Sequence, residues 1–379
     1  MNNHIITIIT VAFIFPSFFG CDNSNREEAF IDINKRDVVS IFDFVDSVSV
    51  LQLETTEKCL LATISKIIPY SNRYYLFDGR QDKVFCFDNN GKFLFQISQK
   101  GRGPTEYSYL EDIAVDQYNN QLILLVPFGE LLFFDLDGNF IYKEFFPNIG
   151  GINEVFVIDA DMLLFTSLNE YYLLFYSRTQ KKVIDKMYPK EDVPSLFSAH
   201  NRLYAFNDSI YFSSIFGNEI LNMSKSDHPV VFTWNFGKMN NSAKQIDRMI
   251  THLKEQRYIG SVGYDEFVGE KSFFNYYIIL CKETSKYRIA MLEYAGDFLL
   301  IYFEKETEKS YVFEKTIEGI RPFPFFIQDE SMFVYDYGET PRDFTPFTTD
   351  VFSPQQLKII QNHDSDSENP FLVIYHLKK

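Results

Sequence analysis

Basic residues and cysteines are scarce in this chain of 379 residues. The sequence holds 36 lysines and arginines against 52 aspartates and glutamates, which leaves a formal net charge of −16 at pH 7. A nucleic-acid-binding protein needs a basic face for the phosphates, so this balance argues against such a partner. Four cysteines are also too few for a small module that is held together by disulfides.

Long apolar runs are missing as well. One apolar segment, residues 5–15, lies at the extreme N-terminus and is far short of what a polytopic membrane protein needs. Yet 46% of the residues are hydrophobic and 17% are aromatic, which is too much for a disordered chain. The composition therefore indicates a globular body large enough to bury a sizeable core.

Local catalytic motifs are absent too. The six histidines show neither H-x-H nor H-E-x-x-H spacing, and no G-x-S-x-G nucleophile elbow is present. The segment 135–139, DLDGN, lacks the remaining ligands of a calcium loop and reads as a hairpin turn. The sequence therefore assigns no catalytic residue and no metal ligand.

The N-terminus has the pattern of an export signal. Residues 5–15, IITIITVAFIF, suit the apolar core of a signal peptide. They are followed by Phe18-Phe19-Gly20-Cys21, and a small residue directly before a cysteine resembles the lipobox of bacterial lipoproteins. This resemblance implies that residues 1–20 are removed and that the thiol of Cys21 is acylated.

Two departures from the lipobox pattern keep other interpretations open. Position −3 holds Phe18, where lipoproteins prefer leucine, and no lysine or arginine precedes the apolar run. The alternatives are a plain secretory signal or a short N-terminal strand.

The residues after Cys21 begin DNSNREEAF and are polar and acidic. They predict a flexible tether over residues 21–39 between the acylated cysteine and a folded body. An acidic stretch at this place resembles a surface-export signal of Bacteroidetes lipoproteins, so we expect a lipid-anchored protein of the outer membrane or cell surface. Three cysteines remain, Cys59, Cys86 and Cys281, so at least one thiol stays free.

The body of the chain contains a repeated strand pattern. Residues 84–95, VFCFDNNGKFLF, and 132–142, LFFDLDGNFIY, each hold two apolar runs joined by Asn-Gly or Asp-Gly. These dipeptides are strong hairpin signals, because both turn positions need a positive φ. The aligned Asp88 and Asp135 lie 47 residues apart. Four strands in a period of about 40–50 residues are typical of a β-propeller.

Weaker copies of the pattern continue to the C-terminus, at residues 154–188, 202–236 and roughly 258–318. The last copy offers three strands, and the early segment 48–54, VSVLQLE, can supply its fourth and so close a ring. The predicted fold is all-β: one six-bladed β-propeller of four-stranded antiparallel blades over residues 40–379, with short helical insertions.

Two insertions have helical patterns. In 241–257, apolar residues recur at helical spacing from Ile246 to Leu253. In 353–361, Ser353 can cap a helix that has Pro354 at its first position. We expect both to pack across an end of the ring.

Residues 101–107, GRGPTEY, stand between the first hairpin and the next predicted strand, DIAVD (112–116). The order FD-x-x-GKFL, then GRGPxEY, then DIAVD resembles the six-bladed β-propeller lipoproteins of Bacteroidetes, which are distantly similar to NHL-repeat propellers. The resemblance covers most of 40–379 and is sharpest over 70–142. It implies the propeller fold and adds little on activity, because the function of that family is largely unestablished.

The segment GRGPTEY has two interpretations. As an inter-blade turn, it uses its glycines for unusual backbone angles and Pro104 for stiffness, and Arg102 can pair with Glu106. As a ligand mouth, it offers the Arg102 guanidinium to a carboxylate and the Tyr107 ring to a sugar or side chain. Arg102, Glu106 and Tyr107 are therefore the candidate ligand-binding residues.

The function that these features favour is a cell-envelope lipoprotein whose propeller binds or scaffolds a glycan, a peptide or a partner envelope protein. It would meet the membrane through its lipid anchor only. The alternatives are a propeller enzyme (a lyase, lactonase or glycan-active hydrolase) with its site in the central channel, and a sensing or regulatory protein. No cofactor is predicted, and a calcium ion in the central channel is the one alternative left open. Converging acidic or histidine side chains around such an ion would favour the enzyme. A Tyr- and Phe-rich groove without a polar cluster would favour binding.

Overall fold

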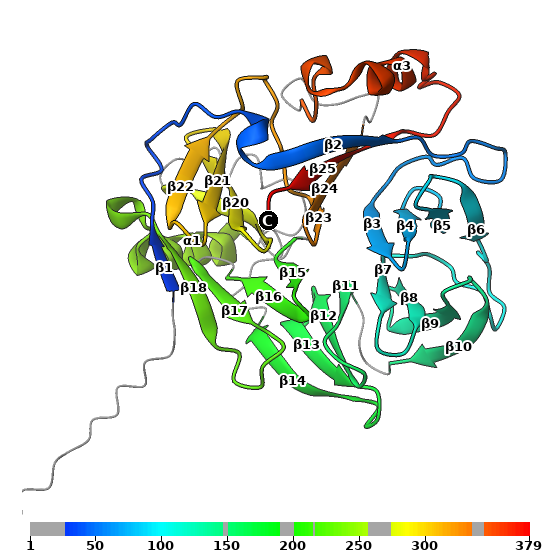
Figure 1. Ribbon diagram of the computed structural model, residues 1–379. Helices are drawn as coiled ribbons and strands as arrows, with labels where there is room; N and C mark the ends of the chain where they lie inside the picture. The colour runs from blue at the N-terminus through cyan, green and yellow to red at the C-terminus, as the bar shows by residue number, and fades with distance from the viewer. Residues whose placement is uncertain (1–26, 147–150, 190–200, 215–216, 257–273, 336–344) are drawn as a thin grey trace, which may run out of the picture.

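The computed structural model describes residues 27–146, 151–189, 201–214, 217–256, 274–335 and 345–379. Six sheets stand around a central axis like the blades of a propeller (Figure 1). Each sheet holds four antiparallel strands, which follow chain order in every sheet except the one that includes β2, and one sheet carries an additional edge strand. The predicted all-β, six-bladed propeller is confirmed.

The first three blades follow one another without interruption. Blade one consists of β3 (Lys66–Tyr70), β4 (Arg73–Asp78), β5 (Lys83–Asp88) and β6 (Phe93–Ile97). Blade two consists of β7 (Asp112–Asp116), β8 (Gln121–Val126), β9 (Glu130–Asp135) and β10 (Phe140–Phe145). Blade three consists of β11 (Ile152–Val157), β12 (Met162–Ser167), β13 (Tyr171–Ser177) and β14 (Lys182–Pro189).

The other three blades complete the ring. Blade four consists of β15 (Leu203–Phe206), β16 (Ser209–Ser213), β17 (Glu219–Asn222) and β18 (Val230–Asn235). Blade five consists of β19 (Tyr277–Glu283), β20 (Tyr287–Tyr294), β21 (Asp297–Glu304) and β22 (Lys309–Phe313). Blade six consists of β23 (Phe326–Gln328), β24 (Ser331–Tyr335), β25 (Leu372–Leu377) and, from the N-terminal part of the chain, β2 (Val45–Leu51).

The core lies between neighbouring blades, so the middle strands are buried on both faces. In β8, every residue from Leu122 to Val126 is buried, which explains why this strand reads as a continuous apolar run and not as an alternation. The outer strand β14 is mostly exposed. Aromatic side chains fill the gaps between and along strands; Phe133 and Tyr142, for example, stack with ring centroids 4.2 Å apart.

The two predicted hairpin turns exist, but their geometry differs from the expectation. Gly91 and Gly138 have φ of 80° and 83°, whereas the residues before them do not have positive φ. In the first turn the carboxylate of Asp88 accepts hydrogen bonds from the amides of Asn90 and Lys92, at 2.8 and 2.9 Å. These bonds, that from Lys92 foremost, lower the pKa of Asp88. The repeated aspartate, which Asp135 matches in blade two, therefore organises a three-residue turn in place of a two-residue one.

The ring closes through the pairing of β2 with β25. The two strands are antiparallel from Val45 opposite Leu377 to Leu51 opposite Leu372. The prediction that the segment 48–54 supplies the last strand of blade six is confirmed. Because the partners come from the two ends of the folded body, their pairing leaves no open blade at the junction.

Residues 27–39 are part of the propeller and do not form the flexible tether that we expected. The additional edge strand is β1 (Glu27–Phe30), which pairs in parallel with β18. Buried and exposed residues alternate from here to Ile33, and the buried ones pack around Trp234. This alternation of buried and exposed residues is typical of a strand, but the polar composition of the segment made it hard to recognise in the sequence. The predicted signal peptide, residues 1–20, and Cys21 lie outside the described residues.

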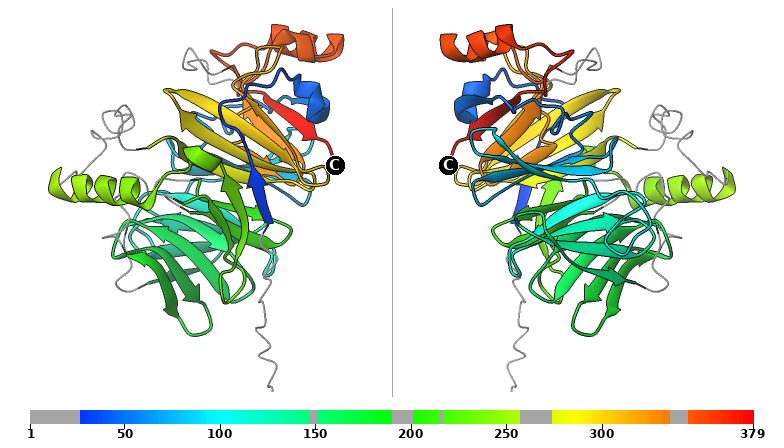
Figure 2. Two further views of the ribbon diagram at one scale, coloured as in Figure 1. Left: turned by 90° about the vertical axis from the view of Figure 1, so that its left-hand side faces the viewer. Right: turned by 90° about the vertical axis from the view of Figure 1, so that its right-hand side faces the viewer.

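Both predicted helices are present, as α1 (Ala243–Gln256) and α3 (Pro354–Asn362). Ser353 caps α3 and forms a capping box with Gln356. The Gln356 side chain also donates to the carbonyl of Val48 in β2 at 2.6 Å, so α3 lies along the outer strand of blade six and not across an end of the ring (Figures 1 and 2). Short 3-10 helices lie at Ile41–Asp43, Gly237–Met239 and Thr349–Val351.

The inner strands all run the same way along the axis, which makes the two ends of the ring different. The end at which they begin carries the links between blades, such as residues 98–111, and is called the link face below. The other end carries the turns from the first to the second strand of each blade, such as residues 71–72, and is called the turn face. Helix α1 lies between β18 and β19 and projects at the link face (Figure 2). In the described part of the chain, no helix has the length and apolar character that a bilayer span requires.

Gly91 tests how closely blade one packs against the segment after β2. A Cβ atom there would lie 2.0 Å from the carbonyl oxygen of Gln52, whereas one on Gly237, which also has a positive φ, would meet nothing within 4 Å. We expect Gly91→Ala to lower the free energy of unfolding by about 3 kcal/mol and Gly237→Ala by only about 1 kcal/mol, because both strain the backbone but only the first creates a clash. Urea denaturation measures both. Equal losses of unfolding free energy in the two variants would show that the carbonyl of Gln52 does not restrict the size of the side chain at position 91.

Candidate functional site

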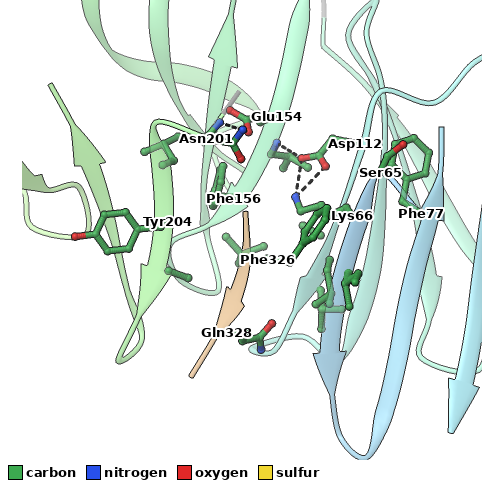
Figure 3. Close-up of a pocket in the computed structure, with 18 of the residues that line it drawn as sticks. Ser65, Lys66, Phe77, Asp112, Glu154, Phe156, Asn201, Tyr204, Phe326 and Gln328 are labelled. Carbon is green, nitrogen blue, oxygen red and sulfur yellow. Dashed lines mark hydrogen bonds and ion pairs between the residues drawn. The ribbon is translucent and has the colours of Figure 1, made fainter. Parts of the chain in front are cut away.

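A cavity of about 920 Å³ occupies the central channel. The inner strands of all six blades, β3, β7, β11, β15, β19 and β23, contribute to its walls, and Figure 3 shows part of this lining. The volume falls within the range of small-molecule sites in proteins. The cavity exists only because the ring brings together residues from 63 to 329 of the chain.

An ion pair links three blades at the wall of this cavity. The Lys66 ammonium lies 2.8 and 3.0 Å from the two carboxylate oxygens of Asp112 (Figure 3). One of those oxygens also accepts a hydrogen bond from the amide of Val155 at 2.9 Å. Asp112 is 5% exposed, so its charge needs these donors. The pair joins the first residues of β3 and β7 and holds β11 beside them.

Glu154 of β11 is also held in place. Its carboxylate accepts hydrogen bonds from the Thr166 hydroxyl at 3.3 Å and from the amide of Asn201 at 3.4 Å. Asn201 precedes β15, so the second contact joins blade three to blade four (Figure 3). Asp112 and Glu154 both line the channel, and the carboxylate of each therefore accepts hydrogen bonds from the protein itself.

Lys282 of β19 differs from these residues. It lines the cavity and is only 9% exposed, yet its ammonium makes no hydrogen bond or close ion pair with any residue that the structure describes. Burial lowers the pKa of Lys282 to about 8; the charge of Lys66 acts in the same direction and that of Glu154 opposes it. The adjacent Glu283, by contrast, lies 2.7 Å from the ammonium of Lys305.

Aromatic rings cover other parts of the wall. Phe156, Tyr204 and Phe326 come from three different inner strands (Figure 3), and the Lys66 ammonium lies 5.4 Å from the centre of the Phe156 ring. The channel therefore combines charged groups with apolar faces and matches neither of the two simple patterns we expected. Within the described ranges, no three histidine, cysteine, aspartate or glutamate side chains converge as metal ligands do.

The two mouths of the channel differ in charge. At the turn face the lining includes Asp208 and Asp329, and burial, with the nearby charges of Glu330 and Asp208, raises the pKa of Asp329. At the link face the lining includes Arg80 and Glu111, which carry opposite charges. An anion therefore meets acidic side chains at the turn face and a balanced mouth at the link face.

The segment 101–107 is an inter-blade turn outside the cavity. Tyr107 is 1% exposed and its hydroxyl donates to the carbonyl of Asp82 at 2.6 Å, so its ring cannot stack on a ligand. Glu106 accepts a hydrogen bond from the amide of Gly103 at 2.7 Å and occupies the space that a side chain at Gly101 would need. Arg102 is exposed and is not among the residues that line the cavity. A ligand role for Arg102 stays a prediction.

The buried cysteines do not add a nucleophile to the site. Cys59, Cys86 and Cys281 are free and buried, and burial raises the pKa of Cys86 to about 12 and that of Cys281 as well. The thiols of Cys86 and Cys281 stay protonated at neutral pH, as expected for small apolar core residues.

The sequence missed every residue of the channel cluster. Lys282 carried the one usable signal, because it is a lysine at the end of an otherwise apolar run, YIILCK, in a predicted strand. Lysine is almost never buried in a core without a partner, so its place in that pattern marks it for function.

Lys282→Met tests the cost of the buried ammonium. The pKa of about 8 in the folded protein lies below that of an unfolded chain, about 10.4. The unfolded state therefore holds more protons between these values, and the stability of the wild type rises with pH across this window. Below about pH 8 the full cost applies, at most about 3 kcal/mol for two to three pKa units.

We therefore expect Lys282→Met to have a higher free energy of unfolding than the wild type at pH 7. Near pH 10 the two free energies should be nearly equal, as measured by urea denaturation. The control is Lys182→Met, which removes an exposed lysine from the outer strand β14 and should leave stability within about 0.5 kcal/mol of the wild type at both pH values. A loss of stability in Lys282→Met at pH 7 would contradict the desolvation argument.

Comparisons with known proteins agree with this architecture. The crystal structure of a Bacteroides fragilis NCTC 9343 protein thought to be exported has a TM-score of 0.68 at 16% identity, over 94% of this chain and 99% of that one. A DUF4221-family member from Bacteroides vulgatus has a TM-score of 0.51 at 11% identity, over 91% and 99%. At these identities the likeness shows the fold alone.

No curated protein is similar enough in sequence to be matched. A family model described as a domain of unknown function, DUF4934, matches residues 28–376. That range includes most of β1 as well as all six blades, which agrees with the place of β1 on the propeller. The chain therefore belongs to the DUF4934 family.

Proposed function

We propose that this protein is a lipid-anchored binding propeller of the bacterial cell envelope that takes a small glycan or peptide into its central channel. The observation that carries the proposal is the cavity of about 920 Å³ with walls from all six blades. Hydrogen-bonding side chains lie beside aromatic faces in it, which is the combination that sugars and peptides need.

The rigidity of the walls supports binding. The Lys66–Asp112 pair and the contacts of Glu154 cross from one blade to the next. Each inner strand is also paired with the second strand of its own blade. A site on such a framework loses little conformational entropy when a ligand arrives, which favours affinity.

The carboxylates Asp112 and Glu154 do not support a propeller enzyme that would use them as its acid and base. A carboxyl group in that role must be free to exchange a proton with the substrate. Asp112 and Glu154 are instead occupied by donors from the protein.

The envelope location rests on the sequence and on one structural relative. The lipobox-like Phe18-Phe19-Gly20-Cys21 follows a signal-like apolar run. The Bacteroides fragilis protein with the same fold is thought to be exported. Acylation of Cys21 would then hold the propeller at a membrane surface, in the outer membrane or at the cell surface.

The position of β1 gives this anchor a direction. Cys21 and Glu27 are six residues apart, and an extended chain of that length spans at most about 21 Å. Because β1 is parallel to β18, with Glu27 opposite Phe232, it begins at the turn face. An anchor at Cys21 would therefore keep the turn face of blade four near the membrane and leave the link face open.

Cys21→Ala tests the anchor. We expect the variant to move from the membrane fraction to the soluble fraction, because a plain polypeptide of this composition has nothing to replace the acyl chains. Ser24→Ala, three residues away, is the control and should stay in the membrane fraction. Immunoblots of separated fractions from the native host measure both, and unchanged fractionation of Cys21→Ala would refute lipidation.

Asn153→Trp tests binding in the channel. Asn153 lines the cavity in β11, so a tryptophan there should fill part of the space and weaken ligand capture at least tenfold. Arg102→Ala, which changes an exposed residue outside the cavity, should keep full affinity. The measurement is a glycan array together with mass spectrometry of small molecules and peptides that the purified protein retains from envelope extracts.

The two variants separate the channel from the segment 101–107. A species retained by the wild type and by Asn153→Trp alike would place binding outside the channel. Loss of binding in Arg102→Ala alone would favour the inter-blade segment.

A further inference from the structure

The charges that line the channel are unevenly compensated. Five acidic and three basic side chains line it among the described residues: Glu111, Asp112, Glu154, Asp208 and Asp329 against Lys66, Arg80 and Lys282. Lys66 is neutralised by Asp112, and Arg80 is exposed to water at the link-face mouth. Of these three basic residues, Lys282 is the one that is buried and has no counter-ion in contact among the described residues.

An ammonium in a largely buried side chain that receives no acceptor from the protein is costly unless the contents of the cavity supply one. Structural lysines avoid this cost by pairing, as Lys305 does with Glu283 at 2.7 Å. Lys282 instead lines a cavity that has room for a ligand. The natural counter-ion of such a group is an anionic group of the molecule that fills the cavity.

We infer that Lys282 anchors a carboxylate group of the ligand that occupies the channel. This inference rests on the proposed function, because it names the chemistry of the molecule that the channel binds. The class is a small organic molecule with a single carboxylate, such as a sugar acid or the C-terminal end of a short peptide.

The other charges of the channel limit the ligand to one negative charge. Asp112 and Glu154 line the same cavity from β7 and β11, so a second anionic group would face a carboxylate. A phosphate dianion or a polyanion is disfavoured for the same reason. Asp208 and Asp329 line the turn-face mouth and would repel an anion there.

Binding should depend on pH through Lys282. The charged and titratable groups that act on its ammonium are Glu154, Lys66 and Cys281. Asp112 and Tyr204 line the same cavity from β7 and β15. Burial keeps the pKa of Cys281 and Tyr204 raised, so these two stay neutral near pH 8. Across the pairing with β20, Lys282 stands opposite the apolar Ile289.

Proton uptake follows from this arrangement. A carboxylate beside Lys282 favours the charged amine and raises its pKa. Above about pH 8 the free protein has lost this proton, so binding must take one up. The affinity should therefore fall about tenfold per pH unit from pH 8 up to the pKa of the complex.

The test measures the titration of Lys282 directly. The lysines of the purified protein are dimethylated with carbon-13, and the Lys282 signal is the one that Lys282→Met lacks in the NMR spectrum. The pH midpoint of the Lys282 titration is measured in three solutions. These are sodium chloride, sodium acetate of equal ionic strength, and sodium chloride with acetamide, which is the uncharged isostere of acetate. We expect a midpoint of about 8 in chloride and acetamide, and a rise of about one unit in saturating acetate.

Thermal stability gives a second readout that does not depend on the methyl label. Acetate should raise the melting temperature of the wild type and of Lys182→Met above that in chloride, and it should not do so for Lys282→Met. Circular dichroism confirms that each variant is folded. An acetate midpoint equal to that in chloride, or equal stabilisation of Lys282→Met by acetate, would overturn the inference.

The outcome is separable from that of the proposed function. If acetate leaves Lys282 unchanged while Asn153→Trp abolishes ligand capture, the channel binds a ligand by other groups and only this inference is wrong. If acetate shifts Lys282 while capture does not depend on the channel, the carboxylate site exists and the proposed function is wrong.

Discussion

The pairing of β2 with β25 is the contact on which the rest of the structure depends. It joins residues 45–51 to residues 372–377 and so turns a row of blades into a ring. A blade buries its middle strands only against two neighbours, so an open row would expose the apolar faces and edges of its two end blades. The channel depends on the same contact, because its wall is complete only when β23 of blade six meets β3 of blade one. The Gln328 side chain donates across that junction to the carbonyl of Pro69 at 2.8 Å.

Closure also explains why charged groups can be placed in the channel. The middle strands of each blade are apolar and fixed by packing, and the inner strands have one side on that core and one side on the cavity. Polar residues on the cavity side are then held by contacts between neighbouring blades, as Lys66 is by Asp112 and Asp112 by the amide of Val155. Such contacts give Lys66 and Asp112 their partners within the protein. Lys282 has no such partner, so an ion pair between its ammonium and a ligand can contribute to the free energy of binding.

The repeat explains which features the sequence could predict. The FD-x-x-G hairpins and the apolar middle strands are local patterns, so they indicated the blades and their number. The channel contacts join residues of different blades: Lys66 and Asp112 are 46 residues apart, close to the 47 that separate Asp88 and Asp135. Residues at matching places in successive repeats face one another around the axis, so alignment of the repeats could have brought this pair to light. Lys282 stayed hidden because the fifth unit is long and its turn signals are weak, and β1 stayed hidden because its acidic composition masked the alternation.

The two ends of the ring differ in ways that support one arrangement. The acids Asp208 and Asp329 lie at the turn face, and β1, which leads from the proposed anchor, also begins there. An anionic membrane surface near the turn face would add to the repulsion that an anionic ligand meets at that mouth. The link face, with its balanced charges at Arg80 and Glu111, points the other way. A ligand with one carboxylate would thus meet balanced charges at the mouth away from the membrane and like charges at the mouth that faces it.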